Sequence, residues 1–223
     1  MAGKDLDRTD RTSISRHAER GSYDRQAAYE ILDEALVAHV GFDAGAGVTV
    51  IPMTYARQGD ELVLHGAVAS RWLSSFENGK DVCVCVTLLD GLVLARSAFS
   101  HSMNYRSLVA FGRAAIVADT DEKQAAFEAL LEHLLPGRWQ DCRQPDRKET
   151  GATTVLKMRI DEASLKVRSG DPVDAEKDYG LDHWAGVIPL ALEAGAAIPD
   201  PAMAEGRSLP GYIERPYRRG GDR

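Results

Sequence analysis

Three short stretches of the sequence gather side chains that could hold a charged or heterocyclic ligand. The first, His65–Arg71, combines an imidazole, small residues, a hydroxyl and a guanidinium. We expect a strand to end at His65 and a helix to begin after Ser70 as its N-cap, so that free backbone amides lie beside Arg71. This combination suits a phosphate group. The alternative is an ordinary capped helix with a surface arginine and a histidine at a strand end.

The second stretch, Phe99–Leu108, places His, Asn, Tyr, Arg and several Ser side chains between two apolar segments. Long hairpin loops that are rich in hydrogen-bonding groups are often binding loops, and we predict one here. The alternative is a solvated loop in which Tyr105 packs against the protein and Arg106 pairs with an acid.

The third stretch, Val50–Tyr55, is an apolar run that contains Pro52. A proline inside such a run indicates a sheet edge or a bulge, because it cannot donate a ladder hydrogen bond. Exposed backbone amides at that edge could meet a planar heterocycle. Protection of the edge against aggregation is the alternative.

Other chemistries lack a signal in this sequence. Cys83 and Cys85 lie two apart on a predicted strand and face one side, but without a second pair they indicate small buried side chains rather than zinc ligands. The six histidines show no metal-ligand spacing, so we predict no metal site. Neither a nucleophile elbow nor a glycine-rich nucleotide loop is present.

The elements that must position these stretches are mainly strands. Apolar periodicity predicts helices at about 24–38 and 121–134, and a short one over 71–77. Asp90-Gly91 predicts a tight hairpin between two strands. The predicted strands are Val48–Tyr55, Glu61–His65, Val82–Leu89, Leu92–Phe99, Leu108–Val117, Thr153–Ile160 and Ser164–Arg168. This order favours a mainly β barrel or sandwich with helical decorations and excludes a doubly wound sheet.

The chain divides into three segments. Residues 1–21 form a polar N-terminal arm in which we expect no core positions, residues 22–170 hold the folded domain, and residues 171–223 form an extended C-terminal tail. The tail contains one apolar island, Trp184–Leu190. We expect it to pack on the barrel or on a dimer partner.

Composition sets the class of the protein. The chain has 223 residues, 44% of them hydrophobic and 27% charged, with a net charge of −7, which argues against nucleic-acid binding. Its longest apolar runs are too short to span a membrane, and its N-terminus lacks a secretory signal. Three cysteines do not make a disulfide framework. We therefore expect a cytoplasmic protein.

The stretches taken together resemble the pyridoxamine 5'-phosphate oxidase-like family of flavin-binding split barrels, especially its nitroimidazole-resistance-type branch. The matching segments are Ile51–Tyr55, Leu64–Arg71, Val86–Arg96, His101–Ser107, Gly112 and Trp184–Leu190. The resemblance implies a six-stranded split β-barrel and a homodimer that binds FMN in grooves at the dimer interface.

The resemblance also implies roles for individual residues. The FMN phosphate and ribityl chain would contact His65, Gly66, Ser70 and Arg71. The isoalloxazine ring would lie along Ile51, Pro52, Met53 and Thr54. For Trp184 two positions stay open: it fastens the tail to the barrel, or the tail folds over the partner's groove and the indole borders the ring. The site would be completed by Asn104, Tyr105, Arg106 and Ser107. Many relatives have lysine in place of Arg71, and no substrate-phosphate residues of vitamin B6 oxidases can be located.

The implied function is that of an FMN-dependent oxidoreductase acting on a small organic substrate. His101 is the candidate for proton transfer, because it lies beside the expected flavin loop. Two alternatives remain open: a split barrel that uses haem or a deazaflavin instead of FMN, and a non-enzymatic flavin-binding or stress-associated protein.

Overall fold

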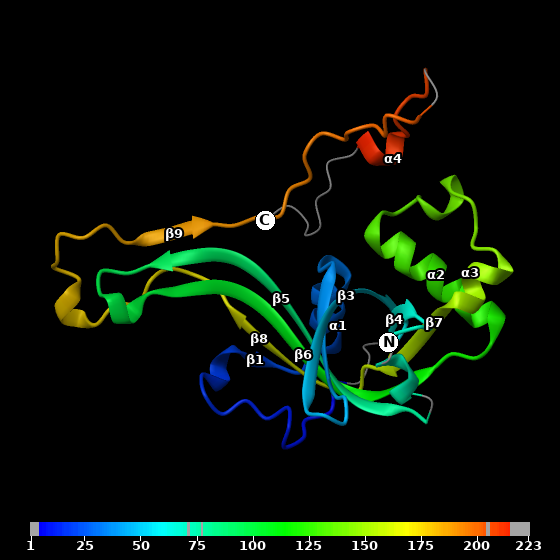
Figure 1. Ribbon diagram of the computed structural model, residues 1–223. Coiled ribbons are helices and arrows are strands. Elements are labelled where there is room, and N and C mark those ends of the chain that lie inside the picture. The colour runs from blue at the N-terminus through cyan, green and yellow to red at the C-terminus, as the bar shows by residue number, and fades with distance from the viewer. Residues whose placement is uncertain (1–4, 71, 77, 204–205, 215–223) are drawn as a thin grey trace.

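Six antiparallel strands close into a barrel in the computed structural model, which describes residues 5–70, 72–76, 78–203 and 206–214 (Figure 1). Around the ring the order is β2, β3, β4, β7, β6, β5, and β5 pairs with β2 to complete it. The strands are β2 (Val37–Asp43), β3 (Val48–Gln58), β4 (Glu61–Ala67), β5 (Lys80–Leu94), β6 (Ser102–Ile116) and β7 (Thr153–Arg159). The predicted six-stranded barrel is confirmed.

Strands β5 and β6 are each 15 residues long, and their distal halves extend beyond the barrel as a hairpin arm, residues 87–107 (Figure 1). Three short strands widen the sheet. β8 (Glu162–Arg168) pairs with β6, β1 (Gly21–Ser22) pairs with β8, and β9 (Gly186–Pro189) pairs with β5 on the arm.

The hairpin predicted at Asp90-Gly91 is wrong. Strand β5 runs through this point with a bulge between Leu89 and Gly91, and the chain reverses only after Leu94. A Cβ atom on Gly91 would lie 3.0 Å from Cγ1 of Val187, so the glycine allows β9 to approach β5 instead of forming a turn. As a consequence most of the predicted binding loop, Phe99–Leu108, is strand β6.

Helix α1 (Arg25–Glu34) begins as expected, because the Asp24 side chain accepts a hydrogen bond from the Ala27 amide at 2.6 Å. Its buried side chains pack on the barrel core. The helix ends four residues before the predicted end, and β2 follows it. Residues 37–43 alternate between exposed and buried, which is the pattern of a strand with one face in the core.

The second predicted helix is α2 (Thr120–Leu134), capped by the Asp119 side chain. It covers a small second core formed with β3, β4 and β7. Two further helices are α3 (Arg147–Ala152) and α4 (Gly211–Glu214). The 3-10 helices are Ala18–Arg20, Leu73–Phe76, Ala98–Ser100, Trp139–Asp141 and Glu176–Asp178.

The N-terminal segment contributes to the core, and the expectation that it would not is wrong. Leu6 is buried in the main apolar cluster, and its amide bonds to the carbonyl oxygen of Tyr23 at 2.9 Å. The Tyr23 hydroxyl donates to the carbonyl oxygen of Thr12 at 2.9 Å. A single leucine among charged residues carries no periodicity, which is why the composition of the segment did not reveal this contact.

No helix in the described part of the chain is long and apolar enough to span a membrane. Likewise, the described residues contain no cluster of three or more His, Cys, Asp or Glu side chains that could hold a metal ion.

Candidate cofactor site

Strands β3 and β4 separate partway along their length, and this opening brings two of the predicted binding stretches together. Their ladder runs from the Gln58–Glu61 pair to the Tyr55–Leu64 pair and ends there. Beyond that pair β3 follows β2, whereas β4 follows β7. Residues 51–54 and 65–67 therefore form the two lips of one split in the barrel wall.

The β3 lip consists of the four residues predicted to lie along a flavin ring. Ile51 and Met53 turn inward and pack against the core, while Pro52 is exposed on the outer face, opposite His39 of β2. The backbone of this lip has a ladder on the β2 side only. Its other edge can hydrogen-bond to a planar ligand that carries donors and acceptors.

The β4 lip carries His65, whose Nδ1 atom is buried and has no hydrogen-bond partner among the described residues. Burial lowers the pKa of this imidazole below its usual value, because the charged form loses hydration. A neutral imidazole brings no positive charge to a phosphate. It does offer a nitrogen lone pair, which is what a metal ion in a cofactor requires.

This lowered pKa makes the stability of the cofactor-free protein depend on pH. The folded state disfavours protonated His65. The contribution of neutral His65 to the free energy of unfolding is therefore complete above the unfolded pKa of about 6.5, and it is lost as the pH falls below that value. We expect the urea midpoint to drop between about pH 7.5 and about pH 5.5, and His65→Gln to reduce that drop. An equal drop in the variant would contradict this assignment.

The turn after β4 depends on Gly66. A Cβ atom there would lie 2.8 Å from Cδ1 of Leu73, so a larger residue would push the turn away from the core. Ser70 donates its amide to the Ala67 carbonyl oxygen at 2.8 Å. The predicted helix over 71–77 is instead a 3-10 helix, Leu73–Phe76, and Arg71 lies outside the described residues.

Arg106, predicted to contact the cofactor, is held by two carboxylates. Its guanidinium donates to both Glu34 carboxylate oxygens, with one NH2 to Oε1 distance of 2.7 Å, and to both Asp90 oxygens at 2.7 and 2.9 Å. These contacts raise its already high pKa further. The arginine ties the hairpin arm to the end of α1, three residues before β2 begins.

The neighbours of Arg106 on β6 also make contacts within the chain. Asn104 is buried and donates its side-chain amide to the Gly170 carbonyl oxygen at 3.1 Å. The Ser107 hydroxyl donates to the Lys166 carbonyl oxygen at 3.2 Å. Tyr105 is half-buried, opposite Leu89 of β5. The structure therefore places Asn104–Ser107 on the arm, apart from the two lips.

Two other predicted residues lie at the far end of the arm. His101 follows the 3-10 helix at the tip, and its Nδ1 lies 2.9 Å from the Ser97 carbonyl oxygen. Trp184 precedes β9 and is 68% exposed, with its indole folded over Gly186. In the single chain Trp184 is therefore not packed on the barrel.

An anchor that the sequence did not reveal holds the base of the tail to the arm. The Asp174 carboxylate is buried and accepts hydrogen bonds from the Arg96 and Ser97 amides at 3.0 to 3.2 Å. These bonds lower the pKa of Asp174 and keep it charged. Asp174 lies in an acid-rich stretch that is typical of solvated loops. Only its contacts with the distant residues Arg96 and Ser97 distinguish it from the other acids of that stretch.

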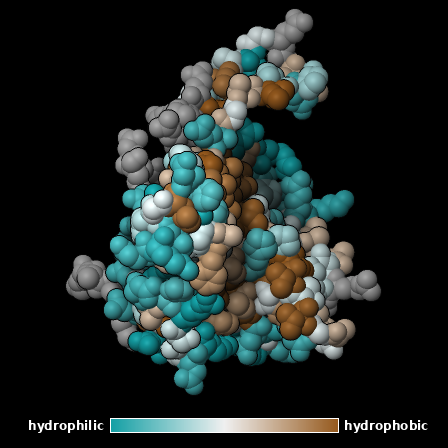
Figure 2. Space-filling view, turned by 90° about the vertical axis from the view of Figure 1, so that its left-hand side faces the viewer, coloured by the Kyte–Doolittle hydropathy of each residue, from teal (hydrophilic) through white to brown (hydrophobic). Residues whose placement is uncertain are grey.

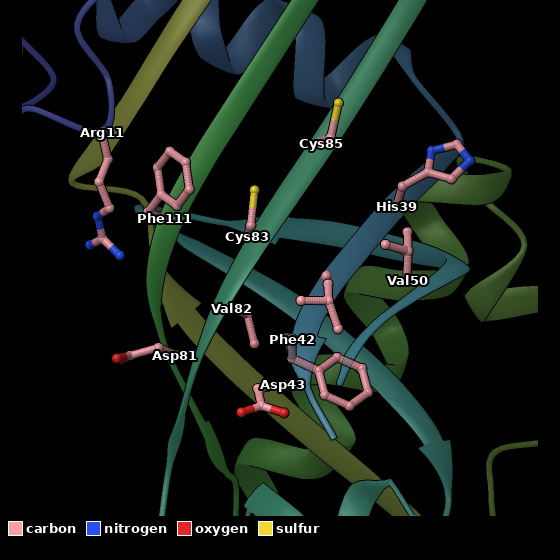
Figure 3. A pocket seen from close by; sticks show the side chains of 12 residues that line it. Arg11, His39, Phe42, Asp43, Val50, Asp81, Val82, Cys83, Cys85 and Phe111 are labelled. Carbon is pink, nitrogen blue, oxygen red and sulfur yellow. The ribbon is translucent and has the colours of Figure 1, made fainter. Parts of the chain in front are cut away.

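The outer face of the barrel carries exposed apolar side chains. β5 turns Val82, Val84 and Val86 into the core and presents Cys83 and Cys85 outward, beside a cavity of about 420 Å³ (Figure 3). The cavity is lined mainly by apolar side chains of β2, β3, β5 and β6, and it includes none of the predicted cofactor residues. Figure 2 shows apolar side chains gathered in a strip along one side of the molecule.

Exposed apolar side chains line this cavity and continue along the arm. Val48 and Val50 line the cavity, and Val37 lies on β2. Leu89, Leu92 and Met103 lie on the arm, and Ile188 lies on the adjoining β9. The signal for this face was the near-continuous apolar run Val82–Leu89, because a strand that is covered on both faces lacks polar alternation. Burial raises the pKa of the Cys83 thiol, which keeps it protonated and argues against a reactive thiolate.

Comparisons with known proteins agree with this geometry. The family model for pyridoxamine 5'-phosphate oxidase matches residues 24–167. The flavocytochrome Anf3 from Azotobacter vinelandii is 38% identical, with a TM-score of 0.87, over 92% of this chain and 96% of that chain. The FAD and heme binding protein from Mycobacterium smegmatis is also 38% identical, with a TM-score of 0.83, over 87% and 96%.

A more distant structure, of a proposed 5-nitroimidazole antibiotic resistance protein from Bacteroides thetaiotaomicron, is 24% identical over 66% of this chain and 86% of that chain, with a TM-score of 0.56. It shares the fold. Among curated proteins none matches. The Azotobacter structure matches 92% of this chain, whereas the family model ends at residue 167 of this chain. The match to the Azotobacter structure therefore includes most of the C-terminal segment that the family model omits.

Proposed function

Because the chain belongs to the pyridoxamine 5'-phosphate oxidase family, we propose that it is a redox protein that binds a flavin and a haem between two copies of itself. One observation carries this proposal. Two solved structures are 38% identical to this chain over nearly their whole length. One is described as a flavocytochrome and the other as an FAD and heme binding protein.

The split between β3 and β4 supports the flavin half of the proposal. The free backbone edge of residues 51–54 suits an isoalloxazine ring, and the turn at Gly66–Ser70 suits the chain that leads to the phosphate. The sequence resemblance implies FMN, whereas the name of the mycobacterial relative favours FAD. Both share the ring and the first phosphate, so the lips serve either one.

His65 supports the haem half. Its imidazole is held neutral, and its buried Nδ1 lacks a hydrogen-bond partner among the described residues, so no hydrogen bond within the protein already uses that nitrogen. When bound, flavin and haem supply the electron transfer, and the protein binds and orients them. We assign His65 as the residue that would hold the iron.

The apolar outer face supports a homodimer. Val48 is 84% exposed and Val50 is 58% exposed beside the cavity, and the apolar surface continues onto the arm. Exposed apolar surface of this extent marks an interaction site. The free thiols of Cys83, Cys85 and Cys142 fit a reducing compartment, from which we infer a cytoplasmic protein.

The absorption spectrum of the protein as purified tests this function. We expect a Soret band together with the yellow flavin bands, and mass spectrometry of the released cofactors to identify a haem and either FAD or FMN. A flavin without haem, even after haem is supplied, would contradict the haem assignment. A deazaflavin mass would contradict the flavin assignment.

Rapid mixing distinguishes an oxidoreductase from a passive binder. A nicotinamide or small organic donor that reduces the bound flavin, with reoxidation by oxygen over repeated turnovers, is the expected behaviour of an enzyme. Cofactors that remain oxidised with every donor tested would favour the non-enzymatic alternative.

A further inference from the structure

The C-terminal segment forms a strap, residues 190–203, that is fixed to the body beyond both of its ends. Before it, β9 pairs with β5, and at the first residue of the strap the Leu190 amide donates to the Asp90 carbonyl oxygen at 3.0 Å. After it, the Tyr212 hydroxyl accepts from Arg138 at 3.0 Å and donates to Asp141 at 2.7 Å. These two anchors lie on the hairpin arm and on the loop after α2, so the strap bridges distant parts of the chain (Figure 1).

Every residue of the strap is exposed in the single chain, although its composition is apolar. Ile198 is 93% exposed and Leu192 is 74% exposed. Beyond the bond from Leu190 to Asp90, the hydrogen bonds found in the strap are local, from the Ala202 and Met203 amides to Asp200. The middle of the strap therefore buries little surface that could offset the entropy lost when its backbone is ordered.

The chemistry of the strap limits what can cover it. Only Glu193 and Asp200 are charged among its fourteen residues, which excludes an electrostatic partner such as nucleic acid. Pro199 and Pro201 restrict the backbone and reduce the entropy lost on docking. An apolar, stiffened segment fits an apolar protein surface.

The strap also continues the exposed apolar outer face, which we proposed above as the dimer interface. It starts directly after β9, where Ile188 lies opposite Leu92 of β5, and both side chains belong to the exposed apolar outer face. Figure 2 shows the C-terminal segment standing off the body above that side of the molecule. A protein seated on the outer face would therefore also lie beneath the strap.

We propose that the strap of each chain closes over a second copy of the same chain, so that two straps clasp the dimer. This inference rests on the homodimer of the proposed function and adds the segment that locks it. The two anchors hold the strap open at the right place before the second copy arrives, which lowers the cost of association.

A photoreactive benzoylphenylalanine in place of Ile198 tests the proposal directly. We expect irradiation of the full-length protein to yield covalent dimers, since Ile198 faces the partner. The same probe in place of Glu19, an exposed residue near β1, is the matched control and should yield few. Crosslinks only within one chain would overturn the proposal.

A pair of neighbouring substitutions gives an independent test. Leu192→Asp should weaken the dimer at least about 100-fold in sedimentation, because each dimer loses two buried leucines. Glu193→Lys should change it much less. Equal effects, or a Leu192→Asp dimer as tight as the parent, would contradict the clasp while the flavin and haem spectrum stands. A parent protein that is monomeric with both cofactors bound would overturn the clasp together with the dimer.

Discussion

Replacing His65 by alanine is expected to remove haem from the protein while flavin remains bound. The imidazole is half-buried and neutral, and its Nδ1 has no hydrogen-bond partner among the described residues, so it retains a nitrogen lone pair that could bind an iron. The measurement is the ratio of the Soret band to the flavin bands, with the haem content per chain. We expect the haem content to fall to near zero.

His101→Ala is the matched control. His101 is also an imidazole near a predicted site, but it lies at the tip of the arm and its Nδ1 already contacts the Ser97 carbonyl oxygen. Its loss should leave the haem content unchanged. The opposite pattern, in which His101→Ala loses haem and His65→Ala keeps it, would show that the iron binds at the arm.

Added imidazole separates a lost ligand from a damaged fold. The cavity that His65→Ala leaves should accept free imidazole, which then restores haem binding and the Soret band. A misfolded variant would not respond. Restored haem with an altered Soret position would still support His65, because a free imidazole is not held in the same orientation.

The sequence predicted the parts of the fold that depend on local pattern. Alternation in Val48–Tyr55 and the stripe of α2 each reflect one covered face, and both elements lie within a few residues of their predicted bounds. The two lips of the split were also recognisable, because Pro52 and the turn at Gly66 have local signatures.

The predictions that were wrong or missing concern residues whose structure depends on partners distant in the chain. Asp90-Gly91 has the composition of a tight turn, yet the Asp90 carboxylate pairs with Arg106 and the space above Gly91 is filled by β9. Leu6 and Asp174 likewise acquire their roles from residues far along the chain. No window of sequence around these residues contains that information.

The Arg106 cluster leads to the second large effect. Arg106→Met is expected to destabilise the protein by about 3–5 kcal/mol, because it leaves the Glu34 and Asp90 carboxylates close together without their shared cation. The Arg106 side chain is only 12% exposed, so water cannot replace it fully. The urea midpoint of the cofactor-free protein measures this loss.

Arg143→Met provides the comparison. Arg143 makes the same kind of two-bond contact, to Glu149 at 2.7 and 2.9 Å, but its side chain is 69% exposed. Solvent screens such a pair, so its removal should move the midpoint far less. Similar losses of stability in the two variants would mean that burial does not determine how much the Arg106 cluster stabilises the protein.

The loss of stability in Arg106→Met should also depend on the Glu34 and Asp90 carboxylates that the substitution leaves unpaired. Adding Glu34→Gln to Arg106→Met removes one of the two unpaired charges, and we expect the double variant to be more stable than Arg106→Met alone. A double variant that is less stable would point to lost packing instead of stranded charge. Flavin binding gives a second readout, because Arg106 links α1 to the arm. If Arg106→Met also binds flavin more weakly, and the double variant regains stability but not flavin binding, the guanidinium positions the arm for the cofactor.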